Sequence, residues 1–268
     1  MPESHSSSSL AGQLVFLGTG TSVGVPMIGC ECTVCQSTDP RNSRTRCGVV
    51  LGLPEGTLLV DTPPELRLQL VREKIGLVHA VLYTHEHADH LYGLDDVRLF
   101  PLKLGKHLPL YCEAPVEARI RRAYDYCFSD LAAKLPAGGV PRVEFERITT
   151  EPFSLLGMRV IPIRLRHGRG DVLGFRFGNV AYCTDVSEIP ADSWPLLAGL
   201  DVLILDALRP RPHPTHFSLE EAIAAAEKIA ARRTIFTHMS HELDHAATCA
   251  ALPASMELAY DGLRVPLA

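Results

Sequence analysis

One short segment, His85-Glu86-His87-Ala88-Asp89-His90, constrains this chain more than any other. It follows residues 80–83, an apolar run typical of a buried strand. Alternate side chains of an extended segment point the same way, so His85 and His87 can reach one centre together. Asp89 and His90 are adjacent and must diverge, which favours two neighbouring metal ions over one. Imidazole and carboxylate groups are ligands of zinc, manganese and iron, so the segment favours a metal site. The alternative interpretation of the segment is a histidine-rich surface loop.

The composition indicates an ordinary globular protein. Of the 268 residues, 46% are hydrophobic and 21% are charged, and the formal net charge of −5 offers no basic face for nucleic acid. No apolar run approaches the roughly 20 residues that span a bilayer. Residues 1–9 are polar and lack the apolar core of a signal peptide, which predicts a cytoplasmic protein. We expect a disordered tail over residues 1–11 and one domain over residues 12–268, because no composition shift marks a linker.

A second metal site is indicated by Cys30, Cys32 and Cys35, which are grouped, whereas the remaining cysteines of the eight are scattered. In a reducing cytoplasm, clustered thiols are more often metal ligands than disulfides. Three thiolates on one loop favour a structural Zn²⁺, although such a site needs a fourth ligand. The alternative is a redox pair or three unrelated thiols.

A small basic patch follows the cysteine loop and consists of Arg41, Arg44 and Arg46. We expect it to be solvated surface, with substrate-anion binding as the alternative.

Four more polar residues stand where predicted strands end: Asp61, His167, Asp185 and His238. Strand ends in α/β proteins meet at one edge of the sheet, so these side chains and the histidine segment are expected to converge there. Asp185 could bridge two metals with its two oxygens, or could cap a helix. Asp61 could support a ligand histidine, or could cap a helix over residues 64–72.

Local signals predict several supporting elements. Hairpins are expected over residues 49–60 and 172–183, and a closing hairpin over residues 256–267. A helix over residues 93–100 is expected to stop at Pro101. Ser218 and Glu221 form a capping box at the start of a further helix.

The order of these residues resembles the metallo-β-lactamase superfamily: a His-x-His-x-Asp-His segment, then a single histidine, a single aspartate and a late histidine on successive strands. The resemblance implies an α/β fold, an αββα sandwich of two mixed β-sheets with helices on the outer faces. It also implies a centre for two catalytic divalent metals, Zn²⁺ or Mn²⁺. By position, one metal would be held by His85, His87 and His167 and the other by Asp89, His90 and His238, with Asp185 bridging.

The cysteine loop and the segment Thr237-His238-Met239-Ser240-His241 narrow the resemblance to the PhnP-type phosphoribosyl 1,2-cyclic phosphate phosphodiesterases. In that family three cysteines and a histidine hold a structural zinc, which implies Cys30, Cys32, Cys35 and His241 here. His216 matches a histidine that assists catalysis, although His213 is close to it in sequence. His216 and Asp89 are the catalytic residues that the resemblance implies.

The function implied is that of a metal-dependent phosphoric diester hydrolase. The expected substrate is a small cyclic phosphodiester, such as phosphoribosyl 1,2-cyclic phosphate, attacked by a hydroxide held between the two metals. Neither a membrane nor a nucleic acid is an expected partner, and a homodimer stays open. The alternatives are a thioesterase-like or lactamase-like hydrolase of the same fold, a nuclease, which would need a basic face, and a non-catalytic metal-binding protein, which would lack ligands.

Overall fold

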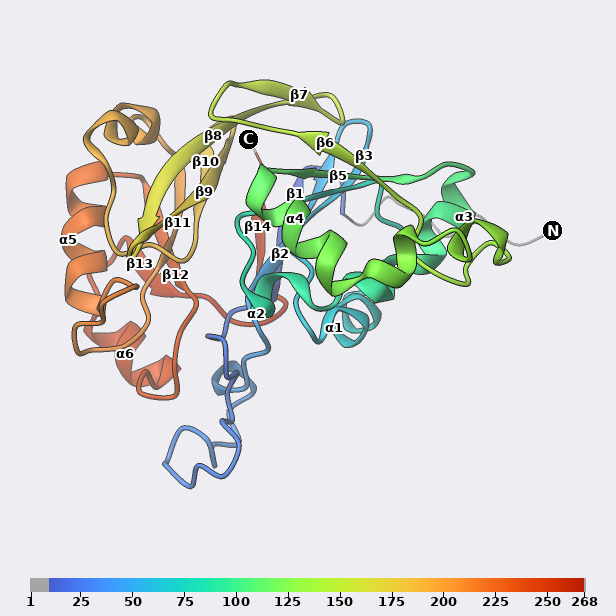
Figure 1. Cartoon of the computed structure of the whole chain (residues 1–268). Helices are drawn as coiled ribbons and strands as arrows, with labels where there is room; N and C mark the ends of the chain where they lie inside the picture. Colours follow the sequence, from blue (N-terminus) through green and yellow to red (C-terminus); the bar gives the residue numbers. More distant parts are fainter. Residues whose placement is uncertain (1–9, 268) are drawn as a thin grey trace.

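The strands of the chain form two sheets that pack face to face, with helices on their outer sides (Figure 1). The computed structural model describes residues 10–267, and across them each sheet has seven strands. In spatial order, the first sheet contains β14 (Arg264–Pro266), β1 (Gln13–Gly18), β2 (Gly48–Leu53), β3 (Gly56–Val60), β4 (Ala80–Leu82), β5 (Leu108–Cys112) and β6 (Val143–Arg147). The second contains β13 (Met256–Leu258), β12 (Arg233–Thr237), β11 (Val202–Asp206), β10 (Val180–Cys183), β9 (Gly170–Phe177), β8 (Met158–His167) and β7 (Phe153–Leu155). The expected sandwich of two mixed sheets is confirmed.

Alternation along the strands divides the apolar residues between two cores. Leu14 and Phe16 of β1 pack between the sheets, whereas Val15 and Leu17 face the helices on the outer side. The first sheet is covered by α1 (Leu66–Arg72), α2 (Ala88–Leu91), α3 (Phe100–Leu104) and α4 (Ala114–Ala123). The second sheet is covered by α5 (Leu219–Ile229) and α6 (His245–Ala251). The capping box predicted for Ser218 and Glu221 is confirmed at the start of α5.

The two sheets repeat one pattern of strand pairing. In each sheet three antiparallel pairings are followed by three parallel ones, from β14 to β6 in the first and from β7 to β13 in the second. β3 and β10 therefore hold equivalent places, and each is followed by an aspartate with positive φ, 65° for Asp61 and 57° for Asp185. Segments that follow parallel strands of the first sheet meet segments that follow parallel strands of the second. The candidate site lies at this junction of the two sheets.

The predicted hairpins β2–β3 and β9–β10 are confirmed, but the predicted closing hairpin is wrong. β13 pairs with β12 in the second sheet, whereas β14 pairs with β1 in the first. A turn such as Asp261-Gly262 shows where the chain reverses, but packing decides which strands pair. Pro101 also does not end a helix: it lies in the first turn of α3, where its missing N–H has no intrahelical partner to lose.

Residues 1–9 of the predicted tail lie outside the described residues, but its last two residues are packed. Leu10 is buried and Ala11 bridges to Gly52, so the ordered chain begins before residue 12. A side chain at Gly52 would lie 2.0 Å from the carbonyl oxygen of Leu10, so only glycine allows this approach. Within residues 10–267, every helix is too short or too polar to cross a bilayer.

Candidate metal centre

Polar residues from both sheets converge on one cluster. The loop after β4 and the first turn of α2 supply His85, His87, Asp89 and His90, and the ends of β8, β10 and β12 supply His167, Asp185 and His238. Their ligand atoms form two groups, each within 4.8 Å: His85, His87, His167 and Asp185 in one, and Asp89, His90, Asp185 and His238 in the other. The structure thus brings together every residue predicted for the two-metal set, and Asp185 belongs to both groups.

The two oxygens of Asp185 face different imidazoles. Oδ2 lies 3.4 Å from Nε2 of His85, whereas Oδ1 lies 3.3 Å from Nε2 of His90 and 3.3 Å from Nε2 of His238. Burial alone would raise the pKa of Asp185, but the facing imidazoles of His238 and His90 hold it well below its ordinary value. The geometry therefore favours the bridging interpretation over the helix cap, since the chain after Asp185 enters no helix until residue 191.

Asp61 orients two of the histidines from behind. Its Oδ2 accepts a 2.8 Å hydrogen bond from Nδ1 of His90 and a 2.8 Å hydrogen bond from the Thr84 hydroxyl. Because that hydroxyl proton points to Asp61, the Thr84 oxygen accepts from Nδ1 of His85, 2.9 Å away. Both rings therefore carry their proton on Nδ1 and present Nε2 to the cluster. The supporting role of Asp61 holds, whereas α1 begins at Leu66 and is not capped by Asp61.

His167 is oriented in the same way by the backbone. Its Nδ1 donates to the carbonyl oxygen of Thr215 at 2.6 Å, which leaves Nε2 facing the cluster, 3.2 Å from Nδ1 of His87. Burial lowers the pKa of His167 to about 4, so the ring is neutral at physiological pH and able to bind a metal.

Buried ring nitrogens without a hydrogen-bond partner indicate whether cations fit this cluster. Within the described part of the chain, Nε2 of His85, His90 and His238 is buried and makes no hydrogen bond. Burial would lower the pKa of His238, but the carboxylate of Asp185 raises it to about 9, and His90 is shifted upward for the same reason. Buried lone pairs and carboxylates in this arrangement fit divalent cations, which would replace the protons that the acids otherwise attract.

A hydrogen-bonded pair beside the cluster joins Asp206, at the end of β11, to His216. Nδ1 of His216 donates to Oδ2 of Asp206 at 2.7 Å, and the His216 ring lies 4.6 Å from that of His167 and 4.7 Å from that of His238. The ring of His213 lies beside that of His216, and His213 is hydrogen-bonded to the Thr215 hydroxyl. His216 adjoins the candidate ligands directly, so it is the better placed of the two. Sequence reasoning missed Asp206, although it ends a buried strand just as Asp185 does.

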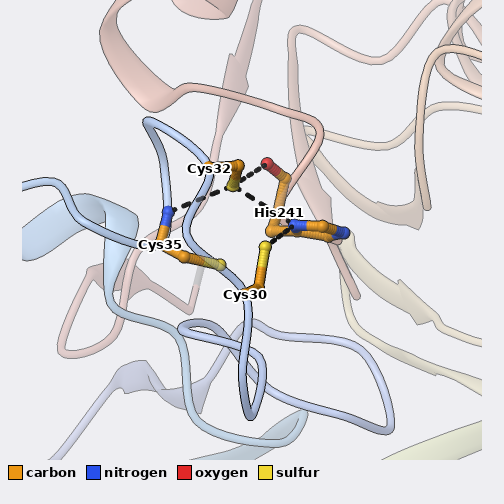
Figure 2. Close-up of side chains that lie close together, drawn as sticks. All are labelled: Cys30, Cys32, Cys35 and His241. Atoms are coloured by element: carbon orange, nitrogen blue, oxygen red, sulfur yellow. Dashed lines mark hydrogen bonds between the residues drawn. The ribbon is translucent and has the colours of Figure 1, made fainter.

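The three cysteines of the long loop before β2 form a separate cluster with His241, which lies on the segment after β12 (Figure 2). Nδ1 of His241 lies 3.2 Å from Sγ of Cys30 and 3.3 Å from Sγ of Cys32. The hydrogen bond from the Cys35 backbone N–H is the largest cause that lowers the pKa of Cys32 to about 6, and the contact with His241 is the second. Burial raises the pKa of Cys35 to about 11. Three sulfur atoms and one imidazole nitrogen are a donor set that fits Zn²⁺, and His241 would supply the fourth ligand that the cysteines lack.

Arg44 joins this loop to the segment after β12. The sequence predicted a solvated side chain, but Arg44 is buried. Its guanidinium donates to the carbonyl oxygens of Ser240 at 2.8 Å and Leu243 at 2.6 Å, one on each side of His241. Burial, opposed by Asp261, lowers the pKa of Arg44 to about 10, which still leaves it charged. The prediction failed because only the tertiary fold brings those carbonyl groups to it.

The sequence and the fold are similar to those of several known proteins. The model of a beta-lactamase superfamily domain matches residues 56–239. A crystal structure described as a new diphosphatase from the PhnP family is 43% identical, with a TM-score of 0.88 over 94% of this chain and 96% of that chain. Zn²⁺-bound PqqB from Methylobacterium extorquens has a TM-score of 0.78 at 21% identity, over 95% of this chain and 100% of that one, which shows a shared fold.

Curated relatives carry other names. An octanoyltransferase of Porphyromonas gingivalis is 35% identical over 253 residues, which are 93% of this chain but 50% of that protein. Coenzyme PQQ synthesis protein B of Methylorubrum populi is 29% identical over 138 residues, 45% of this chain and 44% of that protein. The chain thus spans about half the length of these curated relatives.

Proposed function

The chain belongs to the metallo-β-lactamase superfamily and to its PhnP family, and on that premise we propose that it is a metal-dependent hydrolase of a small phosphodiester. A five-membered cyclic phosphodiester, such as phosphoribosyl 1,2-cyclic phosphate, is the proposed substrate. The observation that carries the proposal is the position of Asp185, whose two oxygens face two separate sets of imidazoles. A bridging carboxylate of this kind suits two cations acting on one phosphoryl group.

The chain's own residues divide the work around the bound cations. His85, His87 and His167 would hold one cation, and Asp89, His90 and His238 the other, with Asp185 shared. The cations would supply an acidified water as nucleophile and neutralise the phosphoryl oxygens. Asp61 turns Nε2 of His85 and His90 toward the cations by accepting their Nδ1–H groups, directly for His90 and through Thr84 for His85.

His216 is placed to act on the leaving group. Because Asp206 binds its Nδ1–H, the remaining ring nitrogen, Nε2, is free for substrate. When Nε2 also carries a proton, the resulting imidazolium would donate that proton to the departing alkoxide oxygen, or a hydrogen bond to a phosphoryl oxygen. General acid catalysis of this kind typically contributes about 10²–10⁴-fold to the rate.

The relatives carry the names of different activities, so alternative functions must be compared with the proposed one. The diphosphatase is the relative that supports phosphoryl chemistry over most of the chain, whereas the octanoyltransferase shares only half of its length with this chain. The net charge of −5 gives no support to a nuclease. A complete ligand set argues against a non-catalytic metal-binding protein.

Substrate comparison tests the proposal. The protein, reconstituted separately with Mn²⁺ and Zn²⁺, is assayed with bis(p-nitrophenyl) phosphate, a five-membered cyclic phosphodiester, a thioester and a β-lactam. We expect the cyclic phosphodiester to give the highest kcat/KM. Faster turnover of the thioester or the lactam would replace the proposal with an acyl hydrolase, and a failure to turn over any of the four would leave a binding protein.

A further inference from the structure

Cys47, Tyr182, Thr184 and Thr237 form a buried hydroxyl–thiol cluster between the two sheets. Cys47, just before β2, comes from the first sheet, and its Sγ lies 3.3 Å from the hydroxyl oxygen of Tyr182 on β10. The same Sγ lies 3.4 Å from the hydroxyl oxygen of Thr237, at the end of β12, and 3.8 Å from that of Thr184. All four side chains are buried in a mainly apolar interface, so each depends on the others for hydrogen bonds.

Thr184 connects this cluster to the bridging carboxylate. Its hydroxyl donates a 3.0 Å hydrogen bond to Oδ1 of Asp185. Because that bond uses the only hydroxyl proton of Thr184, the Thr184 oxygen can only accept from the thiol of Cys47. Burial raises the pKa of Cys47 to about 11, so at neutral pH the thiol carries the proton that it donates. A chain of hydrogen bonds therefore runs from Cys47 through Thr184 to Asp185.

The hydrogen bond from Thr184 fixes the rotation of the Asp185 carboxylate. Oδ1 is the oxygen that faces His90 and His238, whereas Oδ2 faces His85. Among residues 10–267, Thr184 is the one hydrogen-bond donor to this carboxylate that is not itself a candidate ligand. Without that donor the carboxylate could rotate about its Cβ–Cγ bond before a cation binds, and Oδ1 would lose its fixed direction toward His90 and His238.

We propose that Thr184 is a positioning residue, whose hydroxyl holds Asp185 in the orientation that bridges the two cations. The cation position that includes Oδ1, together with Asp89, His90 and His238, should depend on this hydroxyl more than the other position does. Groups that orient metal ligands typically contribute about 10–100-fold to metal affinity. The inference rests on the proposed function, because it assumes that two cations share Asp185.

Metal titration tests the role of Thr184. The full chain is freed of metal with a chelator, and one equivalent of Zn²⁺ is returned for the thiolates of the cysteine cluster, which prefer it. Mn²⁺ is then added, and the free ion is followed by electron paramagnetic resonance. The wild type should bind two equivalents of Mn²⁺. In Thr184→Val, which keeps the shape of the side chain but lacks the hydroxyl, the second equivalent should bind about 10–100-fold more weakly. Thr184→Ser returns the hydroxyl and should bind both equivalents as the wild type does.

Thr237→Val is the matched control. It removes a hydroxyl from the same buried cluster, but Thr237 is hydrogen-bonded to Cys47 and not to Asp185. It should therefore lower the Tm of the metal-free protein much as Thr184→Val does and keep the affinity for both equivalents of Mn²⁺. If Thr184→Val does not fold, Thr184→Ala compared with Thr184→Ser carries the same test, because these two side chains differ by the hydroxyl alone.

Activity measured in the same titrations separates this inference from the proposed function. With bis(p-nitrophenyl) phosphate, Thr184→Val should need more Mn²⁺ for half-maximal turnover and should recover its kcat at excess Mn²⁺. If the second equivalent binds more weakly in Thr184→Val but even the wild type does not cleave the ester, the positioning role stands and the phosphodiesterase proposal fails. The positioning role is overturned if Thr184→Val binds both equivalents as tightly as the wild type, if Thr237→Val loses as much affinity, or if the wild type binds fewer than two.

Discussion

Asp206 accepts a 2.7 Å hydrogen bond from Nδ1 of His216 and thereby fixes which ring nitrogen of His216 can meet a substrate. Its other oxygen lies 3.8 Å from Nδ1 of His238, so one carboxylate stands behind both the proposed acid and a candidate metal ligand. The same Oδ2 also accepts the backbone N–H of Val186 at 2.9 Å, which holds the carboxylate in place. The hydrogen-bonded pair of Asp206 and His216 is therefore anchored both to the end of β11 and to the segment that follows β10.

Removing His216 should depress the chemical step and leave the metals bound. We expect His216→Ala to lower kcat by about 10²–10⁴-fold, the usual contribution of a positioned proton donor. Metal content, measured by atomic emission after gel filtration, should match the wild type because His216 belongs to neither half of the two-metal set. Unchanged kinetics would exclude His216 and direct attention to His213.

Asp206 should act through His216. Asp206→Asn should lower kcat by roughly 10–100-fold, as loss of an orienting partner typically does. In a double-mutant cycle, the same change in the His216→Ala background should cost much less, since the residue it orients is gone. Asp201→Asn, just before the start of the same strand, is the control. Full additivity of the two changes would show that Asp206 does not work through His216.

His87 should be needed for activity and not for the fold. Its side chain is exposed, so His87→Ala removes few packing contacts and should change the free energy of unfolding by no more than about 0.5 kcal/mol. Activity should fall by at least about 100-fold, because one of the proposed ligands is lost. Thermal unfolding and phosphodiester turnover are measured on the same preparation. A fully active variant would remove the histidine loop from the chemistry.

The site could be predicted to a large extent from the sequence because its residues follow apolar strands. Asp61, His167, Asp185 and His238 each end such a strand, and the sheet geometry alone brings them to one junction. Asp206 has the same signal, because it stands at the end of the buried strand β11, and a prediction from the sequence could have included it. Nothing in the local sequence shows that Arg44 is buried, because it contacts Ser240, 196 positions away. Nor does it show that β14 pairs with β1 and not with β13, because Arg264 of β14 lies opposite Val15 near the other end of the chain.

Loss of the cysteine cluster should lower stability more than chemistry. Cys32→Ser removes one of four proposed zinc ligands, and a structural zinc contributes directly to the free energy of folding. We expect a lower Tm and the loss of one equivalent of zinc, with kcat reduced less than in His216→Ala. Cys127→Ser, outside both clusters, is the control. Full zinc content together with an unchanged Tm would show that Cys32 holds no metal.

The same cluster predicts an unusual pH dependence of thiol alkylation. The pKa of Cys32 is lowered to about 6, so after metal removal by a chelator its thiolate should be present at neutral pH. Its reaction with iodoacetamide should rise with pH and reach half its maximal rate near pH 6, whereas Cys35, with a pKa of about 11, should stay unreactive. Peptide mass spectrometry follows each thiol separately. A midpoint for Cys32 near the ordinary thiol value would show that the Cys35 backbone N–H and His241 do not stabilise its thiolate.

Arg44 should matter for stability because it supports the segment that carries His241. In Arg44→Met the carbonyl groups of Ser240 and Leu243 lose their donors, and each unsatisfied buried group costs about 1–3 kcal/mol. At roughly 2–4 °C per kcal/mol for a chain of this size, Tm should fall by about 5–15 °C. Arg41→Met, at an exposed position where the guanidinium lies 5.1 Å from the centre of the Tyr260 ring, is the matched control and should change Tm by no more than about 3 °C. Zinc release, followed with a chromogenic chelator, should be faster in Arg44→Met because His241 is no longer held between two fixed carbonyl groups. Equal Tm and equal release rates in the two variants would show that the buried guanidinium does not position His241.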